Sequence, residues 1–506
     1  MVKFLRRALL PFTVFVTGAC VLIVEIVAIR ILAPYFGNTI YSVSSVISVV
    51  LAALSLGYWV GGRMADRYPV KQLFFALVAF SGVLVLFIKV LQDAILPAYG
   101  FSLPLTTGPL IASAVLFFAP SFVMGLLSPF AVALHQREAK IKGVGTAAGQ
   151  IFFFSTVGSI LGSLLAGFVL IPYLGIATIL VGVGVLLVLM GMLPVVWIGI
   201  EKRFTIAAFV LSGSMLILVL AGSTNSNTLY SHDGVYERIT IFDGTYHGRP
   251  TRFLMQDASN SAAMYLDGDD LTFDYTKYYT LHSIFVSKLN RALMLGGGAY
   301  SVPKALMTDL SDVKVDVSEI EPSLIPLSKK YFDLKDSPRL THYIEDGRRM
   351  LHDTSNRYDL IFSDVYHSIY SVPAHFTTRE FMELASSRLT DDGVFIANLI
   401  GSTSTEGPSF IWSEIRTMQQ VFPEVYIFGV SSPDSAETQN IIVVGSKSEV
   451  RKDMYDPSLR RSAYQAVREA AGHYLDHSHI DLRSYRVLTD DYAPVDYLTS
   501  KILPKR

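Results

Sequence analysis

Two patterns of hydrophobic residues divide the chain into two parts. Up to about residue 222, apolar residues run almost without interruption, in blocks separated by short polar loops. Beyond that point they come in short runs separated by turns rich in Gly, Asp and Pro. The first pattern is typical of membrane-spanning helices, and the second of alternating strands and helices. The pattern therefore predicts a transmembrane domain at residues 1–222 and a water-soluble part after it.

Seven apolar stretches in the first part are long enough to cross a bilayer. They cover residues 10–33, 41–62, 72–92, 108–134, 145–171, 174–199 and 204–222. Lys and Arg cluster in alternate loops: before the first stretch and after the second, fourth and sixth. The positive-inside rule then places the N-terminus in the cytoplasm. Seven spans from a cytoplasmic start would leave the second part outside, and the loop charges favour that side.

Two charged residues interrupt the first apolar stretch, Glu25 in mid-span and Arg30 five positions later. Ionisable groups in lipid are costly and usually face a bundle interior or a cavity. We expect them to form a membrane charged pair. A functional role and a structural role, with Arg30 reaching the interface and Glu25 bonding a neighbouring helix, both stay open.

The second part begins with a polar linker at residues 223–228 and three β-type runs, at 235–242, 251–255 and 262–266. Regular alternation of apolar strands and helical segments follows. Such alternation predicts a parallel, mostly buried sheet covered by helices. We therefore expect a linker, small β-domain and entry helix at 223–284, followed by an α/β Rossmann-like domain at 285–506.

A glycine turn follows the first strand of that alternating region. The apolar run before it opens into Gly296, Gly297 and Gly298. Glycine lets the backbone approach a ligand closely, because it has no Cβ. About twenty residues later a second apolar run ends at Glu319, where a carboxylate can accept both hydroxyls of a ribose. The combination predicts a nucleoside-binding site.

Two further carboxylates occupy strand ends. Asp346-Gly347 follows a short apolar run, and Asp364 ends the buried-type run at 358–363. Ligands of a parallel sheet bind at the carboxyl ends of its strands, which makes both residues candidates for the site. A simple Asp-Gly turn, and an Asp capping the turn after its strand, are the alternatives.

With these motifs in place, residues 229–500 resemble the polyamine aminopropyltransferases, or spermidine synthases, which share their fold with Rossmann-like methyltransferases. The whole chain resembles the membrane-fused spermidine synthase-like proteins. The resemblance implies a transferase that uses decarboxylated S-adenosylmethionine as co-substrate and an amine or polyamine as acceptor. It also implies roles for single residues: Asp364 as general base, Glu319 on the ribose, and Asp346 on the adenine amino group. The matching motifs are Gly296–Gly298, Glu319 with Ile320 and Pro322, Asp346-Gly347 and Asp364.

Several positions depart from the family pattern. Ala299 follows the glycines where the family has Asp, Ser261 replaces a Gln, and Leu271-Thr272 replace an Asp-Glu pair. His367 stands where the family has a second carboxylate for the diamine. The nucleoside half of the site is kept and the diamine half is largely rewritten. Our candidate acceptor pocket comprises Asp257, Tyr275, Tyr366, His367 and Asp491.

Composition narrows the classes of protein. Hydrophobic residues make up 51% of the chain and charged residues 17%, which is too apolar for a soluble enzyme of this size. A net charge of -1 argues against a nucleic-acid partner. The single Cys20 excludes an intrachain disulfide, and the histidines lack metal-ligand spacing. The expected partners are an amine, the lipid bilayer and, as an open alternative, a second copy of the chain as a homo-oligomer.

Three functions stay open at this point. The first is a membrane-anchored aminopropyltransferase, and the second is an S-adenosylmethionine-dependent methyltransferase of the same fold. The third is a transporter or sensor whose second part binds a nucleoside or polyamine. Loss of the diamine-side carboxylates counts against the first function, whereas retention of Asp364 favours an enzyme. Aminopropyl transfer is our working hypothesis.

Overall fold

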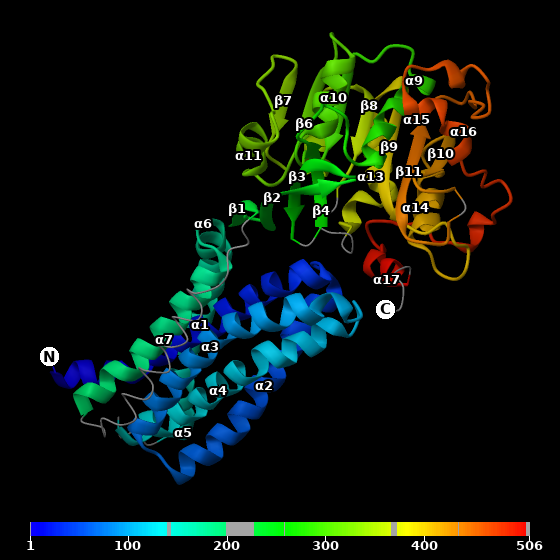
Figure 1. The fold of residues 1–506 in the computed structure, drawn as a ribbon. Helices are drawn as coiled ribbons and strands as arrows, with labels where there is room; N and C mark the ends of the chain where they lie inside the picture. The colour runs from blue at the N-terminus through cyan, green and yellow to red at the C-terminus, as the bar shows by residue number, and fades with distance from the viewer. Residues whose placement is uncertain are drawn as a thin grey trace. The chain divides into compact units, whose positions relative to one another are not determined.

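The computed structural model describes residues 2–138, 143–198, 227–257, 259–365, 372–433 and 435–501 (Figure 1). The chain divides into two compact units, Met1–Asn225 and Ser226–Lys505. In the described residues the first unit is helical and the second is α/β, in agreement with the two hydrophobic patterns.

Five helices of the first unit are long and apolar enough to cross a membrane. They are α1 (Val2–Phe36), α2 (Ile40–Arg67), α3 (Lys71–Tyr99), α4 (Gly108–Glu138) and α5 (Val144–Leu165), the last continued by η2 (Ala166–Leu170) and α6 (Ile171–Tyr173). A further helix, α7 (Ile176–Ile198), has a shorter apolar part at Ile176–Met192. The predicted seventh stretch, 204–222, lies outside the described residues, so the number seven stays a prediction.

Glycines bring pairs of these helices into backbone contact. A Cβ on Gly18 of α1 would collide with the carbonyl oxygen of Ser155 on α5. A Cβ on Gly57 of α2 would likewise collide with the carbonyl oxygen of Phe122 on α4. Close approach of this kind is how small residues hold helices together in lipid. Glu25 and Arg30 are both partly exposed on α1, and their pairing stays a prediction.

The second unit opens with a four-stranded antiparallel sheet in the order β1-β2-β3-β4. Its strands are β1 (Thr228–Asp233), β2 (Arg238–Tyr246), β3 (Arg249–Gln256) and β4 (Ser259–Tyr265). Two short helices, η3 (Asp274–Leu281) and α9 (His282–Phe285), then lead into the main sheet. The three predicted β-type runs correspond to β2, β3 and β4, whereas β1 was not predicted.

The main sheet has seven strands in the order β10-β11-β9-β8-β5-β6-β7. They are β5 (Arg291–Leu295), β6 (Lys314–Ser318), β7 (Leu340–Tyr343), β8 (Tyr358–Ser363), β9 (Leu389–Gly401), β10 (Glu424–Gly429) and β11 (Gln439–Ser446). Strands β5 to β9 are parallel to one another, and β11 is antiparallel to both β9 and β10. This is a mixed Rossmann-like sheet, as the alternation predicts.

Helices pack on both faces of this sheet (Figure 1). Alternate residues of β5 point to opposite faces. Leu293 and Leu295 pack with α12 (Gly347–Asp353), α13 (Arg379–Arg388) and α14 (Phe410–Met418). Ala292 and Met294 pack with η3, α10 (Ser301–Asp309) and α15 (Gln465–Arg468). The remaining helical segments are α11 (Leu324–Tyr331), η4 (Ala374–Phe376), η5 (Leu459–Arg461), α16 (Ala470–His473), η6 (Leu482–Ser484) and α17 (Val495–Ser500).

The chain reverses direction across the sheet at β5, because β6 lies on one side of it and β8 on the other. Doubly wound sheets bind ligands outside the carboxyl ends of the strands at such a switch point. The turn after β5 is the glycine turn, and the residue after β8 is Asp364. The topology thus brings the two sequence motifs side by side.

Candidate functional site

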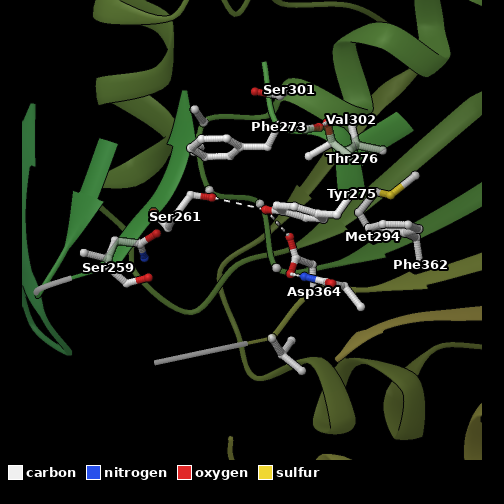
Figure 2. Close-up of a pocket in the computed structure, with 18 of the residues that line it drawn as sticks. Ser259, Ser261, Phe273, Tyr275, Thr276, Met294, Ser301, Val302, Phe362 and Asp364 are labelled. Atoms are coloured by element: carbon white, nitrogen blue, oxygen red, sulfur yellow. Dashed lines mark hydrogen bonds between the residues drawn. The ribbon is translucent and has the colours of Figure 1, made fainter. Parts of the chain in front are cut away.

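A cavity of about 770 Å³ lies at this switch point. Residues at or near the carboxyl ends of the parallel strands line it, among them Gly296–Gly298, Glu319, Asp346, Asp364 and Asn398. Residues of η3 and of the four-stranded sheet, including Tyr275 and Ser261, form its other wall (Figure 2). Segments far apart in the sequence therefore line one space.

The glycine turn requires its glycines. Gly296 has a φ of 89° and Gly298 a φ of 49°, values that favour residues without a Cβ. A Cβ on Gly296 would also collide with the carbonyl oxygen of Asp364. The turn after β5 and the end of β8 are consequently in backbone contact, which fixes the distance between the nucleoside motif and the candidate base.

Glu319 holds the glycine turn in place. Its Oε2 accepts hydrogen bonds from the backbone N–H of Gly297 at 2.8 Å and of Gly298 at 3.2 Å. Its Oε1 accepts one from Glu321 N–H at 2.9 Å. Burial raises the pKa of Glu319, and these hydrogen bonds offset part of the rise. Since a carboxylate has about four acceptor positions, roughly one is left for a ribose hydroxyl.

Asp346 caps a helix, so the turn alternative describes part of its role. Its Oδ1 accepts from the backbone N–H of Arg348 at 3.0 Å and of Arg349 at 3.1 Å, at the start of α12. Its Oδ2 lies 3.0 Å from Nε2 of His375. Burial alone would raise the pKa of Asp346, but His375 and the two N–H groups outweigh it and hold that pKa below its usual range. Asp346 and Gly347 also line the cavity.

Asp364 receives a hydrogen bond on each carboxylate oxygen. The hydroxyl of Tyr275 donates to Oδ2 at 3.0 Å (Figure 2). Nδ2 of Asn398 donates to Oδ1 at 2.8 Å. Both donors lie on other elements, η3 and β9, rather than in the following turn. Burial raises the pKa of Asp364 above its usual value, and the two hydrogen bonds offset part of that rise. Such a carboxylate is a stronger base than one in water.

The structure distributes our acceptor-pocket candidates differently. Tyr275 lines the cavity, whereas Asp257 and Asp491 are not among its described lining residues, and the assignment of all three to the acceptor stays a prediction. Asp257 instead accepts from the backbone N–H of Arg238, and Asp491 is exposed. Tyr366 and His367 lie outside the described residues.

Asp490, the residue before Asp491, anchors the C-terminal region. Asp490 pairs with Arg348, with Nη1 and Oδ1 2.7 Å apart, and also accepts from the hydroxyl of Thr378. These contacts tie the region to the start of α12, where Asp346 lies. Asp490 therefore helps to hold the start of α12 beside the site.

Sequence reasoning missed Glu237, a lining residue with 4% of its surface exposed. Its Oε1 accepts from Gln256, and among the described residues its Oε2 has no hydrogen-bond partner. Burial raises the pKa of Glu237 well above its usual value, and the nearby charge of Asp257 adds a smaller rise. A single Glu beside a strand carries no sequence signal of such burial.

We expect Glu237→Gln to stabilise the protein increasingly as the pH rises. Glu in an unfolded chain ionises near pH 4.3, whereas folded Glu237 keeps its proton well above that. Below the pKa of Glu237 in the unfolded chain, its contribution to the free energy of unfolding is fully present. As the pH rises from that pKa towards the pKa in the folded chain, this contribution is lost, by at most about 1.4 kcal/mol per pH unit. Thermal unfolding of both proteins between pH 4 and 8, in steps of about one unit, should show a widening difference. A constant difference would contradict the buried, protonated state.

Carboxylates dominate the charged groups around the cavity. Six of the described lining residues are acidic, and the described lining contains no Lys or Arg. The acidic residues are Glu237, Asp274, Glu319, Glu345, Asp346 and Asp364. The described residues contain no group of three or more His, Cys, Asp or Glu side chains that could hold a metal ion. The cavity suits an organic cation.

Comparison with known proteins finds one matching family model and several similar proteins. Residues 279–454 match the family model described as the spermine/spermidine synthase domain. A polyamine aminopropyltransferase of Vibrio vulnificus is 23% identical over 292 residues, covering 54% of this chain and 92% of the relative. Polyamine aminopropyltransferase 2 of Ralstonia nicotianae is 24% identical over 487 residues, covering 88% of each chain. A probable spermidine synthase structure from Corynebacterium glutamicum covers 54% of this chain and 99% of its own, with 22% identity and a TM-score of 0.44.

The sheet, the glycine turn and the acidic cavity define a Rossmann-like domain with a candidate ligand site, and this domain follows a set of apolar helices. More specifically, residues 279–454 match the spermine/spermidine synthase domain, and the chain is similar to the polyamine aminopropyltransferases. The match to the Ralstonia relative extends over 88% of the chain and so includes much of the helical part. The resemblance seen in the sequence motifs is confirmed.

Proposed function

We propose that this protein is a membrane-anchored aminopropyltransferase that moves the aminopropyl group of decarboxylated S-adenosylmethionine onto an amine. The relatives named polyamine aminopropyltransferases support the reaction. The five long apolar helices support the anchoring, and the loop charges support a cytoplasmic N-terminus with the second unit outside. The cavity supports the choice of donor, which is the observation that carries the proposal.

The donor follows from the charges around the cavity. Decarboxylated S-adenosylmethionine carries a sulfonium and an ammonium group and no carboxylate. Intact S-adenosylmethionine has a carboxylate, which a site normally pairs with Arg, Lys or backbone N–H groups. Six acidic residues, of which Glu237 keeps its proton, and no Lys or Arg line the described cavity, so the ionised ones would repel a carboxylate on the ligand. The cavity therefore favours decarboxylated S-adenosylmethionine, which has no carboxylate, over the intact molecule.

The nucleoside part of the donor occupies the motif side of the cavity. Gly296–Gly298 lie against it, the remaining acceptor position of Glu319 binds a ribose hydroxyl, and Asp346 with Gly347 faces the adenine amino group. This arrangement directs the sulfonium towards Asp364. Orientation of this kind contributes a large share of the rate in displacement reactions.

Asp364 acts as general base. The acceptor amine is protonated at neutral pH and must lose a proton to become nucleophilic, and the carboxylate of Asp364 accepts that proton. The nitrogen lone pair then forms a bond to the methylene carbon of the aminopropyl group beside the sulfonium, and the bond between that carbon and sulfur breaks. Its electron pair stays on sulfur, so neutral methylthioadenosine leaves. The elevated pKa of Asp364 makes it suited to this task.

Calorimetry on the purified full-length protein in detergent tests the donor. We expect decarboxylated S-adenosylmethionine to bind at least about ten-fold more tightly than the intact molecule, equal to roughly 1.4 kcal/mol. Methylthioadenosine is the control ligand, because it keeps the nucleoside and lacks both the ammonium and the carboxylate. Equal or tighter binding of intact S-adenosylmethionine would contradict the proposal and favour a methyltransferase.

A further inference from the structure

We propose that Asn440 is a positioning residue for the base: it orients Asn398 so that Asp364 is held in its ionised, proton-accepting form. This inference rests on the proposed function, because it assigns Asp364 the role of base. It adds two residues from β9 and β11, which lie on the β8 side of β5 in the sheet. Neither residue carried a signal in the sequence.

A chain of two hydrogen bonds links Asn440 to the base. Nδ2 of Asn440 donates to Oδ1 of Asn398 at 2.9 Å, and Nδ2 of Asn398 donates to Oδ1 of Asp364 at 2.8 Å. Asn398 is 3% exposed, and both asparagines line the cavity. We call this chain the asparagine relay.

Strand pairing brings the two asparagines together. Asn398 lies in β9 and Asn440 in β11, and these strands are antiparallel. Asn440 is paired with Ile400, two positions from Asn398 and therefore on the same face of the sheet. Diagonal neighbours of this kind are within reach of a carboxamide side chain. The relay thus depends on the β9–β11 register.

The direction of the relay decides which form of Asp364 it stabilises. A carboxamide has a donor end and an acceptor end, and the donor on Asn440 occupies the acceptor end of Asn398. The NH₂ group of Asn398 must then face Asp364, where it suits an ionised carboxylate. The reversed amide would present its oxygen to Asp364 and would suit a protonated carboxyl group instead.

The other groups around Asp364 do not replace the relay. Gly296, in the turn after β5, presents its backbone to the end of β8. Among the described residues, Tyr275 of η3 is the titratable side chain that forms a hydrogen bond with Asp364. Like Asn398, it donates this bond to the carboxylate. Met294 and Phe362 contribute apolar surface, which favours the neutral carboxyl. The relay opposes that preference.

The test compares Asn440→Leu with Asn440→Gln. Leu removes the donor at similar volume and frees the Asn398 amide to reverse, whereas Gln keeps a donor. We expect Asn440→Leu to move the acid limb of the pH profile of kcat/KM upwards by about one pH unit, with Asn440→Gln close to wild type. At high pH, where Asp364 is ionised in every variant, the Leu variant should recover most of its activity.

A second readout separates this inference from the proposed reaction. Infrared titration of the carboxyl band that disappears in Asp364→Asn reports the protonation of Asp364 without turnover. The same upward shift is expected there for Asn440→Leu, or for Asn440→Ala if the Leu variant does not fold. An unchanged titration, or equal shifts in the Leu and Gln variants, would overturn the relay. If the wild-type protein transfers no aminopropyl group but Asn440→Leu still shifts the titration of Asp364, only the proposed reaction is contradicted.

Discussion

Asp364→Asn is expected to reduce aminopropyl transfer by about 10²–10⁴-fold, the usual contribution of a general base. Asn keeps the shape of the side chain and an oxygen that accepts the hydrogen bond from Asn398. Its amide can donate to the hydroxyl of Tyr275, so the local geometry has a way to persist. What disappears is the ability to take a proton from the amine.

Steady-state kinetics and calorimetry with methylthioadenosine together check this expectation. Nucleoside binding should survive, because it depends on the glycine turn and Glu319. Tyr275→Phe is the matched control: it removes one hydrogen bond from Asp364 and leaves the carboxylate, so its effect on turnover should be much smaller. Full activity of Asp364→Asn with the true acceptor would show that another group is the base.

Glu319→Ala is expected to weaken binding of methylthioadenosine by about 100-fold or more. The change leaves three backbone N–H groups, those of Gly297, Gly298 and Glu321, without their acceptor. A buried donor without a partner costs about 1–3 kcal/mol. The glycine turn should therefore lose its bound shape even before the ribose contact is counted. Calorimetry on both proteins measures the difference.

A comparison of two ligands separates the two roles of Glu319. If Glu319 only holds the turn, Glu319→Ala should weaken adenine and methylthioadenosine by the same factor. If it also binds the ribose, methylthioadenosine should lose more affinity than adenine. Glu319→Gln, which retains one acceptor oxygen for the turn, is the matched control and should lose less. Equal binding of methylthioadenosine by wild type and Glu319→Ala would refute both roles.

Much of the fold could be predicted from the sequence, because long apolar runs and strand–helix alternation are local signals. The strand β1 could not, since Thr228–Asp233 is largely polar and follows a polar stretch, so it looks like linker. Its edge position pairs it with β2 alone and leaves most of its side chains partly or fully exposed. A strand of this kind is stabilised by its neighbour rather than by its own hydrophobic pattern.

Site residues could be predicted from the sequence where a glycine or a carboxylate directly follows a predicted strand. Gly296, Glu319 and Asp364 meet that condition, and the structure brings all three to one cavity. Asp257 and Asp491 were chosen for charge alone, and nothing in their local sequence states where their side chains lie. The hydrogen-bond partners of Glu319 were also hidden, because a carboxylate after a strand looks the same whether it binds a ribose or a backbone turn.

The asparagines of the relay could not be predicted for a different reason. Asn398 and Asn440 are distant from Asp364 in the sequence, and only the pairing of β9 with β8 and β11 makes them its neighbours. An Asn within a buried strand looks like an interruption of the apolar pattern. Its role depends on which side chain it faces across the sheet, which is a property of the register.

Product analysis by mass spectrometry tests the central claim most directly. The purified full-length protein is incubated with an amine panel and either decarboxylated or intact S-adenosylmethionine, with Asp364→Asn in parallel. Our account predicts methylthioadenosine and an aminopropylated amine from the decarboxylated donor with the wild-type protein, and almost none with the variant. A methylated product together with S-adenosylhomocysteine from the intact donor, or no transfer from either donor, would contradict it.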